Sequence, residues 1–202
     1  MNEEQRKLQA RCSTIGMVVR AAFWLLILLL AARVGIAVWC SMLPAGHFMA
    51  VRQQTETILC AEKGLTVSFP AQTAAPAALL AHKKEAFLIG AWSGCLASAF
   101  LCAVLWQLRG LFKGIDEEGA PFQARHVARV HRAGVLMMLR GVVPHLAEGI
   151  VLMIFGMWGG TVFGGEALRS GGLWIFTGSV LLCLAQIFRY GCALQTESDE
   201  TL

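Results

Sequence analysis

A stretch of 23 residues, from Ala86 to Leu108, contains no Asp, Glu, Lys, Arg or His. An α-helix rises about 1.5 Å per residue, so about 20 such residues cross a hydrocarbon core that is about 30 Å thick. Three further stretches are mostly apolar but contain a few charged residues, and charged residues make up only 15% of the whole chain, against about 25% in soluble domains. The sequence therefore predicts a protein that crosses a membrane several times.

The four predicted spans cover residues 21–43, 86–108, 134–158 and 172–189. Because backbone groups in lipid must find hydrogen bonds within the protein, these spans are expected to be helices. We predict an all-α fold, a four-helix transmembrane bundle that forms a single integral membrane domain over residues 1–202. A cleaved signal peptide is the alternative for the first stretch, but apolar character resumes after Arg33 and no A-x-A cleavage site follows.

The distribution of Lys and Arg near the span ends predicts the orientation of the chain. Ten of these residues lie in the N-terminal segment, in the basic loop 109–133 and just after the last span. Five lie on the other side, in the loop 44–85 and between the last two spans. Since the side richer in Lys and Arg is normally cytoplasmic, both termini and the loop 109–133 are predicted to be inside. The loop 44–85 is then the outer loop.

The outer loop contains three prolines, Pro44, Pro70 and Pro76, which argue against one continuous helix there. Pro76 suits the first turn of a helix that continues into the second span. The loop is long enough for a small cap. Cys60 lies in it, and a disulfide with Cys40 is conceivable, although connectivity cannot be read from a sequence.

The inner loop carries a basic helical segment. Arg125, Arg129 and Arg132 are spaced at i, i+4 and i+7, which places them on one face of a helix. One interpretation is an amphipathic segment on an anionic inner leaflet, with the arginines on lipid phosphates. The other is a docking surface for a soluble cytoplasmic regulator. His126 and His131 are five residues apart and do not share a face, so a metal site is not predicted there.

Ionisable residues also occur at membrane depth. Arg33 lies about 18 Å from the predicted inner edge of its span, and Glu148 lies about 21 Å from the inner edge of the third span. A charge at that depth costs about 2.5–3.5 kcal/mol on insertion scales and usually has a partner. We hypothesise that Arg33 and Glu148 pair, with His145 on the adjacent turn. The alternatives are that Arg33 extends toward the interface, or that Glu148 lies closer to the membrane surface.

Small residues repeat at four-residue spacing in two places. Gly90, Gly94 and Ser98 form one stripe, and Gly156, Gly160 and Gly164 form the other. Such stripes let helix backbones approach closely in lipid, where packing replaces the hydrophobic effect. They are expected to serve helix packing inside the bundle, and a homo-oligomer face is the alternative.

Nothing in the sequence indicates catalysis. It shows no nucleophile motif, no paired carboxylates and no Cys/His spacing suited to zinc, so we predict no catalytic residues, no metal and no cofactor. The net charge of +4 is explained by basic residues beside apolar stretches and does not call for direct nucleic-acid binding.

Two segments carry a family resemblance. The string LFKGIDEEGAPFQARHVARVHRAG (111–134) and the ending LAQIFRYGCALQTESDETL (184–202) are similar to domain-of-unknown-function family 2975 (DUF2975). The resemblance is specific over about residues 105–202. In this chain Gln195, Thr196 and Glu197 stand where the family's tail is often more acidic.

The resemblance implies a small four-span protein of the bacterial cytoplasmic (inner) membrane without an established activity. Members are often encoded beside small helix-turn-helix regulators, which implies a role in regulation or envelope stress. The leading prediction is therefore a non-enzymatic membrane protein that regulates or senses through its cytoplasmic loop and tail. The alternative is a small transporter, channel or immunity-type protein that uses the intramembrane polar residues.

Overall fold

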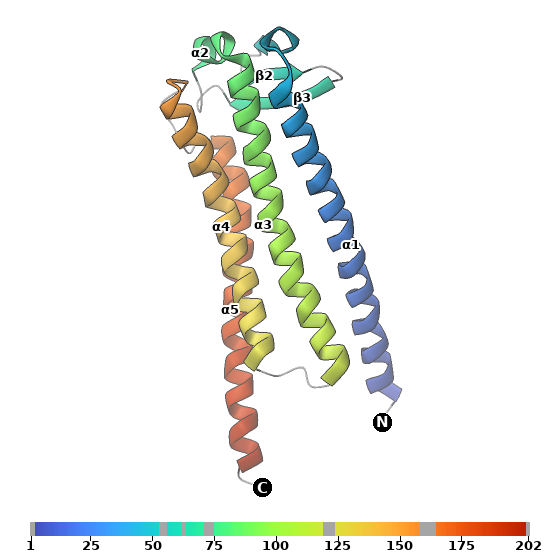
Figure 1. Ribbon diagram of the computed structural model, residues 1–202. Helices are drawn as coiled ribbons and strands as arrows, with labels where there is room; N and C mark the ends of the chain where they lie inside the picture. The colour runs from blue at the N-terminus through green and yellow to red at the C-terminus, as the bar shows by residue number, and fades with distance from the viewer. Residues whose placement is uncertain are drawn as a thin grey trace. The chain divides into compact units, whose positions relative to one another are not determined.

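The structure, a computed structural model, describes residues 3–52, 56–61, 64–70, 75–118, 124–157 and 165–200. Its elements in chain order are α1 (Glu3–Met42), η1 (Ala45–His47), β1 (Met49–Arg52), β2 (Glu56–Ala61), β3 (Leu65–Pro70), α2 (Pro76–Ala81), α3 (Lys83–Glu118), α4 (Ala124–Ile154) and α5 (Gly165–Glu200) (Figure 1).

Four of these helices are long and apolar enough to cross a membrane, which confirms the predicted all-α transmembrane fold. Their apolar parts cover Thr14–Met42, Lys83–Gly114, Arg125–Ile154 and Gly171–Leu194. Each helix begins before the predicted span, and α3 and α5 also end after it, because charged residues at span ends continue a helix as readily as apolar ones do. Much of the predicted inner loop is therefore helical, in the last turns of α3 and the first turns of α4. The predicted end of the third span at residue 158 is wrong, since α4 ends at Ile154.

The chain divides into two compact units. Unit 1 consists of residues 1–28, 100–139 and 174–202, and unit 2 consists of residues 29–99 and 140–173. Unit 1 is built from segments of the four long helices, and unit 2 adds to its helical segments a small cap formed by the strands and α2.

The cap contains an antiparallel sheet that the sequence reasoning missed. Its order is β1-β2-β3, with Met49 opposite Cys60 and Leu59 opposite Val67. Gly64 precedes β3 with a φ of 77°, in the left-handed region that glycine enters without steric cost. Buried and half-buried residues alternate along β2, as expected for a strand with one face on the core. Figure 1 shows the sheet and α2 beside the C-terminal end of α1 and the first turns of α3.

The core of unit 2 joins the cap to the helices. Leu59, Phe69 and Leu79 of the cap are fully buried and cluster with Phe87 of α3 and Leu152 of α4. Pro76 stands in the first turn of α2, as predicted, and His82 separates that helix from α3. Cys40 and Cys60 are both free thiols.

The end of α4 is closed by a Schellman motif. Gly156 has a φ of 67°, its N–H donates to the carbonyl of Met153, and the N–H of Met157 donates to the carbonyl of Leu152. Met157 and Leu152 are both fully buried, which supplies the hydrophobic contact of this motif. The carbonyl of Met157 then accepts a hydrogen bond of 2.9 Å from the N–H of Ala75, which ties the start of α2 to the end of α4.

Candidate functional site

Arg33 contacts the small-residue stripe of α3. Its Nη1 donates to Ser98 Oγ at 3.4 Å, and a methyl group built on Gly94 would lie 3.4 Å from the same nitrogen. The stripe of Gly94 and Ser98 therefore leaves room for a guanidinium group and offers it an oxygen. This contact lies within unit 2.

Glu148 of α4 also contacts α3, at a different serine. Its Oε2 lies 3.0 Å from Ser93 Oγ, which in turn lies 3.0 Å from the carbonyl oxygen of Gly90. Ser93 and Ser98 are five residues apart and so lie about 140° apart around a helix with 3.6 residues per turn. Within the part of the chain that the structure describes, no hydrogen bond or ion pair joins Arg33 to Glu148.

Two more polar residues, Arg140 and His145, precede Glu148 on α4. The Nε of Arg140 donates to the carbonyl of Ala97 at 3.2 Å. The ring of His145 lies beside α5, because a methyl group built on Gly171 would be 3.5 Å from His145 Cδ2. The three membrane-depth residues predicted from the sequence thus contact different neighbours. Arg33 contacts Ser98, Glu148 contacts Ser93, and His145 lies beside α5.

A cavity of about 450 Å³ opens beside Glu148 in unit 2. Its walls are one face of α3, from Glu85 to Leu96, and one face of α4, from Ala147 to Phe155. Most of the lining is apolar, but Glu85, Ser93 and Glu148 add three polar side chains. An apolar cavity with a few placed polar groups is the usual form of a small-molecule site.

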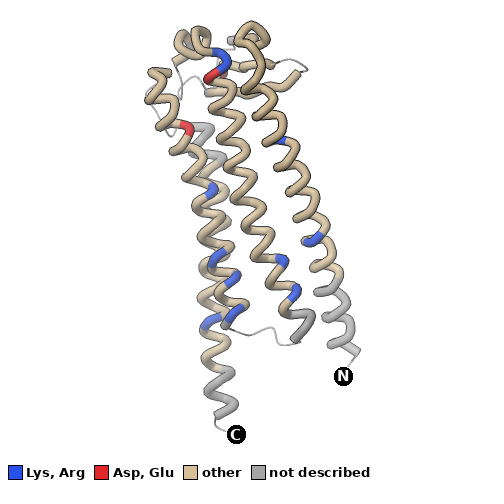
Figure 2. The backbone as a smooth tube through the Cα atoms, in the orientation of Figure 1, with Lys and Arg blue, Asp and Glu red and all other residues tan. Residues whose placement is uncertain are grey.

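Over the full sequence unit 1 carries ten Lys or Arg and eight Asp or Glu residues, a net charge of +2. Figure 2 shows Lys and Arg positions on segments of all four long helices of this unit. Among the side chains that the structure describes there, seven are Lys or Arg and none is Asp or Glu: Arg20, Arg109, Lys113, Arg125, Arg129, Arg132 and Arg189.

The three arginines of the predicted basic helix have different surroundings. Arg125 and Arg132 are exposed. Arg129 is half-buried and donates a hydrogen bond from Nη1 to the carbonyl of Gly110 on α3. Arg129 therefore helps to hold α4 on α3, and Arg125 and Arg132 remain at the surface.

Arg109 lies within a group of aromatic rings. Its guanidinium carbon is 5.4 Å from the ring centroid of Phe23 and 5.8 Å from those of Trp24 and Trp106. Phe23 and Trp106 also contact each other, with centroids 5.6 Å apart. Cation–π attraction at such distances is worth about 0.5–2 kcal/mol per contact. Because Phe23 and Trp24 belong to α1 and Arg109 to α3, these contacts help to hold the two helices together.

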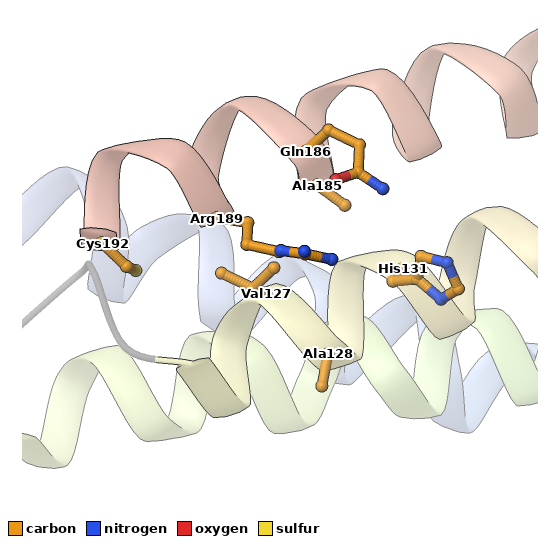
Figure 3. Close-up of a pocket in the computed structure, with 7 residues that line it drawn as sticks. All are labelled: Val127, Ala128, His131, Ala185, Gln186, Arg189 and Cys192. Carbon is orange, nitrogen blue, oxygen red and sulfur yellow. The ribbon is translucent and has the colours of Figure 1, made fainter. Parts of the chain in front are cut away.

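A second cavity, of about 390 Å³, lies between α4 and α5 in unit 1. Figure 3 shows the Arg189 side chain reaching from α5 toward α4 over Val127, with its guanidinium group turned toward His131. The sequence reasoning used Arg189 only for orientation and set His131 aside. A basic pair in a pocket is suited to an anion, because both groups are hydrogen-bond donors when charged.

The described residues of the two predicted stripes have roles other than packing the face of one helix against the face of another. A methyl group built on Gly90 would meet the side chains of Val67 and Phe69, so this glycine lets α3 approach β3. Gly94 and Ser98 receive Arg33, and Gly156 ends α4 in the Schellman motif. Gly160 and Gly164 lie outside the described residues.

Two close contacts between helix backbones join α4 to α5, and the sequence did not predict them. A methyl group on Gly178 would lie 2.7 Å from the carbonyl oxygen of Gly134, within unit 1. A methyl group on Gly171 would lie 2.6 Å from the carbonyl oxygen of Gly141, within unit 2. Both helices thus carry glycines seven residues apart, a spacing of two turns that returns to the same face.

Among the residues described, no group of three or more His, Cys, Asp or Glu side chains is placed to hold a metal ion. Two charged features remain: the exposed Arg125 and Arg132 at the start of α4 in unit 1, called the basic end below, and the cavity of unit 2 that Glu85 and Glu148 line.

The comparisons with known proteins add a family. A model for proteins of unknown function (DUF2975) matches residues 71–202, about two thirds of the chain. The match includes both segments that carry the sequence resemblance and begins earlier, at residue 71 instead of about 105. No curated protein and no solved structure matches the chain.

Proposed function

Because the chain belongs to the DUF2975 family, whose function is unknown, we propose a role from its own side chains. The role is that of a non-enzymatic regulatory or sensory protein of the bacterial inner membrane, which holds an acidic region of a soluble cytoplasmic regulator at its basic end. The observation that carries this proposal is the exposure of Arg125 and Arg132 at the start of α4.

The different environment of Arg129 supports the proposal. Arg129 is used to fix α4 on α3, whereas Arg125 and Arg132 stay exposed seven residues apart, about 10 Å along the helix. A pair of exposed arginines on one helix is a geometry that carboxylates on a partner can match, because each guanidinium can donate two parallel hydrogen bonds to one carboxylate. Such rim charges act mainly on the association rate and on the choice of partner.

The proposal requires the basic end to face the cytoplasm. We expect green fluorescent protein fused after the last residue to be fluorescent, and alkaline phosphatase fused after Gly64 to be active, because Lys and Arg are retained inside. A fusion after residue 119 serves as the second inner position. An active phosphatase at 119 or at the C-terminus would contradict the orientation and, with it, the proposed partner site.

The partner site is tested by photocrosslinking in cells. A photoreactive amino acid at Ala128, which is exposed between Arg125 and Arg132 on α4, is expected to capture a soluble protein. The double change Arg125→Ala with Arg132→Ala should reduce that adduct about tenfold, as expected when contacts worth about 1.4 kcal/mol are lost. The yield is read from gels and the captured protein is identified by mass spectrometry.

Arg20→Ala is the matched control, because Arg20 is an exposed arginine of the same unit on a different helix. It should leave the adduct unchanged. Adducts to lipid alone, or equal losses in the double variant and in Arg20→Ala, would replace the partner site with general attraction to the anionic inner leaflet.

A further inference from the structure

The carboxyl group of Glu148 lies in mostly apolar surroundings. Its Oε2 is held by Ser93, and within the described part of the chain the other oxygen, Oε1, has no hydrogen-bond partner. Glu148 also lines the cavity of about 450 Å³ in unit 2. A carboxylate in apolar surroundings is costly unless a positive charge or hydrogen-bond donors accompany it.

The cavity itself supplies no such positive charge. No Lys, Arg or His is among its lining residues, whereas a second carboxylate, that of Glu85, is. The two arginines of unit 2 at membrane depth have other contacts: Arg33 donates to Ser98 and Arg140 donates to the carbonyl of Ala97. The charge of the lining is therefore negative, and a bound cation would complement it.

The rest of the lining restricts what kind of cation fits. Leu88, Ile89 and Leu96 of α3, Val151 of α4 and Phe155 directly after α4 form apolar walls. The ring of Trp92 also lines the cavity and can attract a cation to its face. A metal ion would meet two carboxylates from different helices among mostly apolar side chains, whereas an organic cation would also bury its carbon atoms against these walls.

We propose that this cavity binds hydrophobic organic cations, of the ammonium or phosphonium type, with Glu148 as the counterion. The volume lies within the range of about 300–1,000 Å³ that is typical of small-molecule sites. Ser93 positions the carboxylate, and Trp92 lies against the cation. The site goes beyond the proposed regulatory role: it lies in unit 2, shares no residue with the Arg125 and Arg132 surface, and stands if that surface binds nothing.

The test is equilibrium binding of radiolabelled tetraphenylphosphonium to the full-length protein in an uncharged maltoside detergent. Glu148→Gln keeps the shape of the side chain and an oxygen for Ser93 but removes the charge, and it is expected to weaken binding at least about tenfold. Glu56→Gln, which changes another partly buried glutamate of unit 2 outside the cavity, should leave binding unchanged. Tetraphenylborate, with the same shape and opposite charge, should not bind.

A second variant separates the cavity from the charge. Leu96→Trp keeps both carboxylates but fills part of the space, so binding should also be lost in a protein that elutes as the folded wild type does on size exclusion. Binding that persists in both Glu148→Gln and Leu96→Trp would overturn the site. Equal binding of tetraphenylborate would also overturn the site, because it would mean that both ions only partition into an apolar cavity, without a contribution from the charge of Glu148.

Discussion

Gly178→Leu is expected to separate α4 from α5 in unit 1. The first side-chain carbon would lie 2.7 Å from the carbonyl oxygen of Gly134 and 2.9 Å from the backbone nitrogen of Met138. These are backbone atoms, which cannot move aside as the end of a flexible side chain can. Overpacking usually costs about 1–3 kcal/mol, and a leucine against backbone belongs at or above the top of that range. Thermal unfolding of the purified protein in maltoside, followed by circular dichroism, measures the loss.

Gly172→Leu is the matched control for this change. Gly172 lies on the same helix, and a methyl group built there would meet no atom within 4 Å. It should leave the unfolding temperature nearly unchanged or raise it, since leucine favours a helix by nearly 1 kcal/mol over glycine. Equal destabilisation by both changes would mean that glycine is required for a reason other than the contact with α4.

Phe69→Ala is expected to have the other large effect, on the cap. Phe69 is fully buried in the core of unit 2, where it packs with Leu59 and lies over Gly90. Removing a buried phenylalanine side chain costs about 3–5 kcal/mol, because a cavity remains that the neighbours fill only in part. A small sheet has little stability in reserve. Hydrogen exchange of the amides of β2 should therefore accelerate by more than a hundredfold, while that of α5 changes little.

Phe176→Ala provides the comparison, since Phe176 is 69% exposed on α5 in unit 1. In a membrane that side chain faces lipid or another apolar surface, so its loss should leave the exchange of β2 as it is. Unchanged exchange of β2 in Phe69→Ala would contradict the assignment of Phe69 to the core that holds the cap.

The membrane fold could be predicted because lipid leaves the backbone few choices. A long uncharged stretch such as 86–108 must satisfy its own hydrogen bonds, and a helix is the simplest way. The cap sheet lies outside this constraint and depends on a weaker signal. Alternation of apolar and polar residues from Leu65 to Phe69 was visible, but three prolines and an Ala-rich segment drew attention to a loop and a helix.

The residues of the candidate sites could be found, but their partners could not. The apolar stretches fix how deep Arg33 and Glu148 lie, yet they do not fix the direction in which each side chain points around its helix. Ser98 was predicted only as a small residue of a packing stripe and Ser93 was not predicted at all, although each contacts one of the two ionisable groups.

The glycine contacts were missed for a related reason. A search for small residues at every fourth position is suited to helices that cross closely, and it selected the stripe that begins at Gly90, which in the structure faces β3 and the side chain of Arg33. In α4 and α5 the glycines in contact are seven residues apart, at Gly134 and Gly141 and at Gly171 and Gly178. A seven-residue spacing is easily overlooked when only one helix is considered, and it becomes informative when a second helix repeats it.

The contact between Arg33 and Ser98 has a consequence for how the chain enters the bilayer. The two residues are 65 positions apart, so α1 leaves the ribosome well before the oxygen that its arginine will contact has been made. Until then α1 carries an unsatisfied charge, which costs about 2.5–3.5 kcal/mol at membrane depth. The second span therefore supplies Arg33 with a polar contact that the first span does not offer, and the order of synthesis makes this contact available only after α3 has been made.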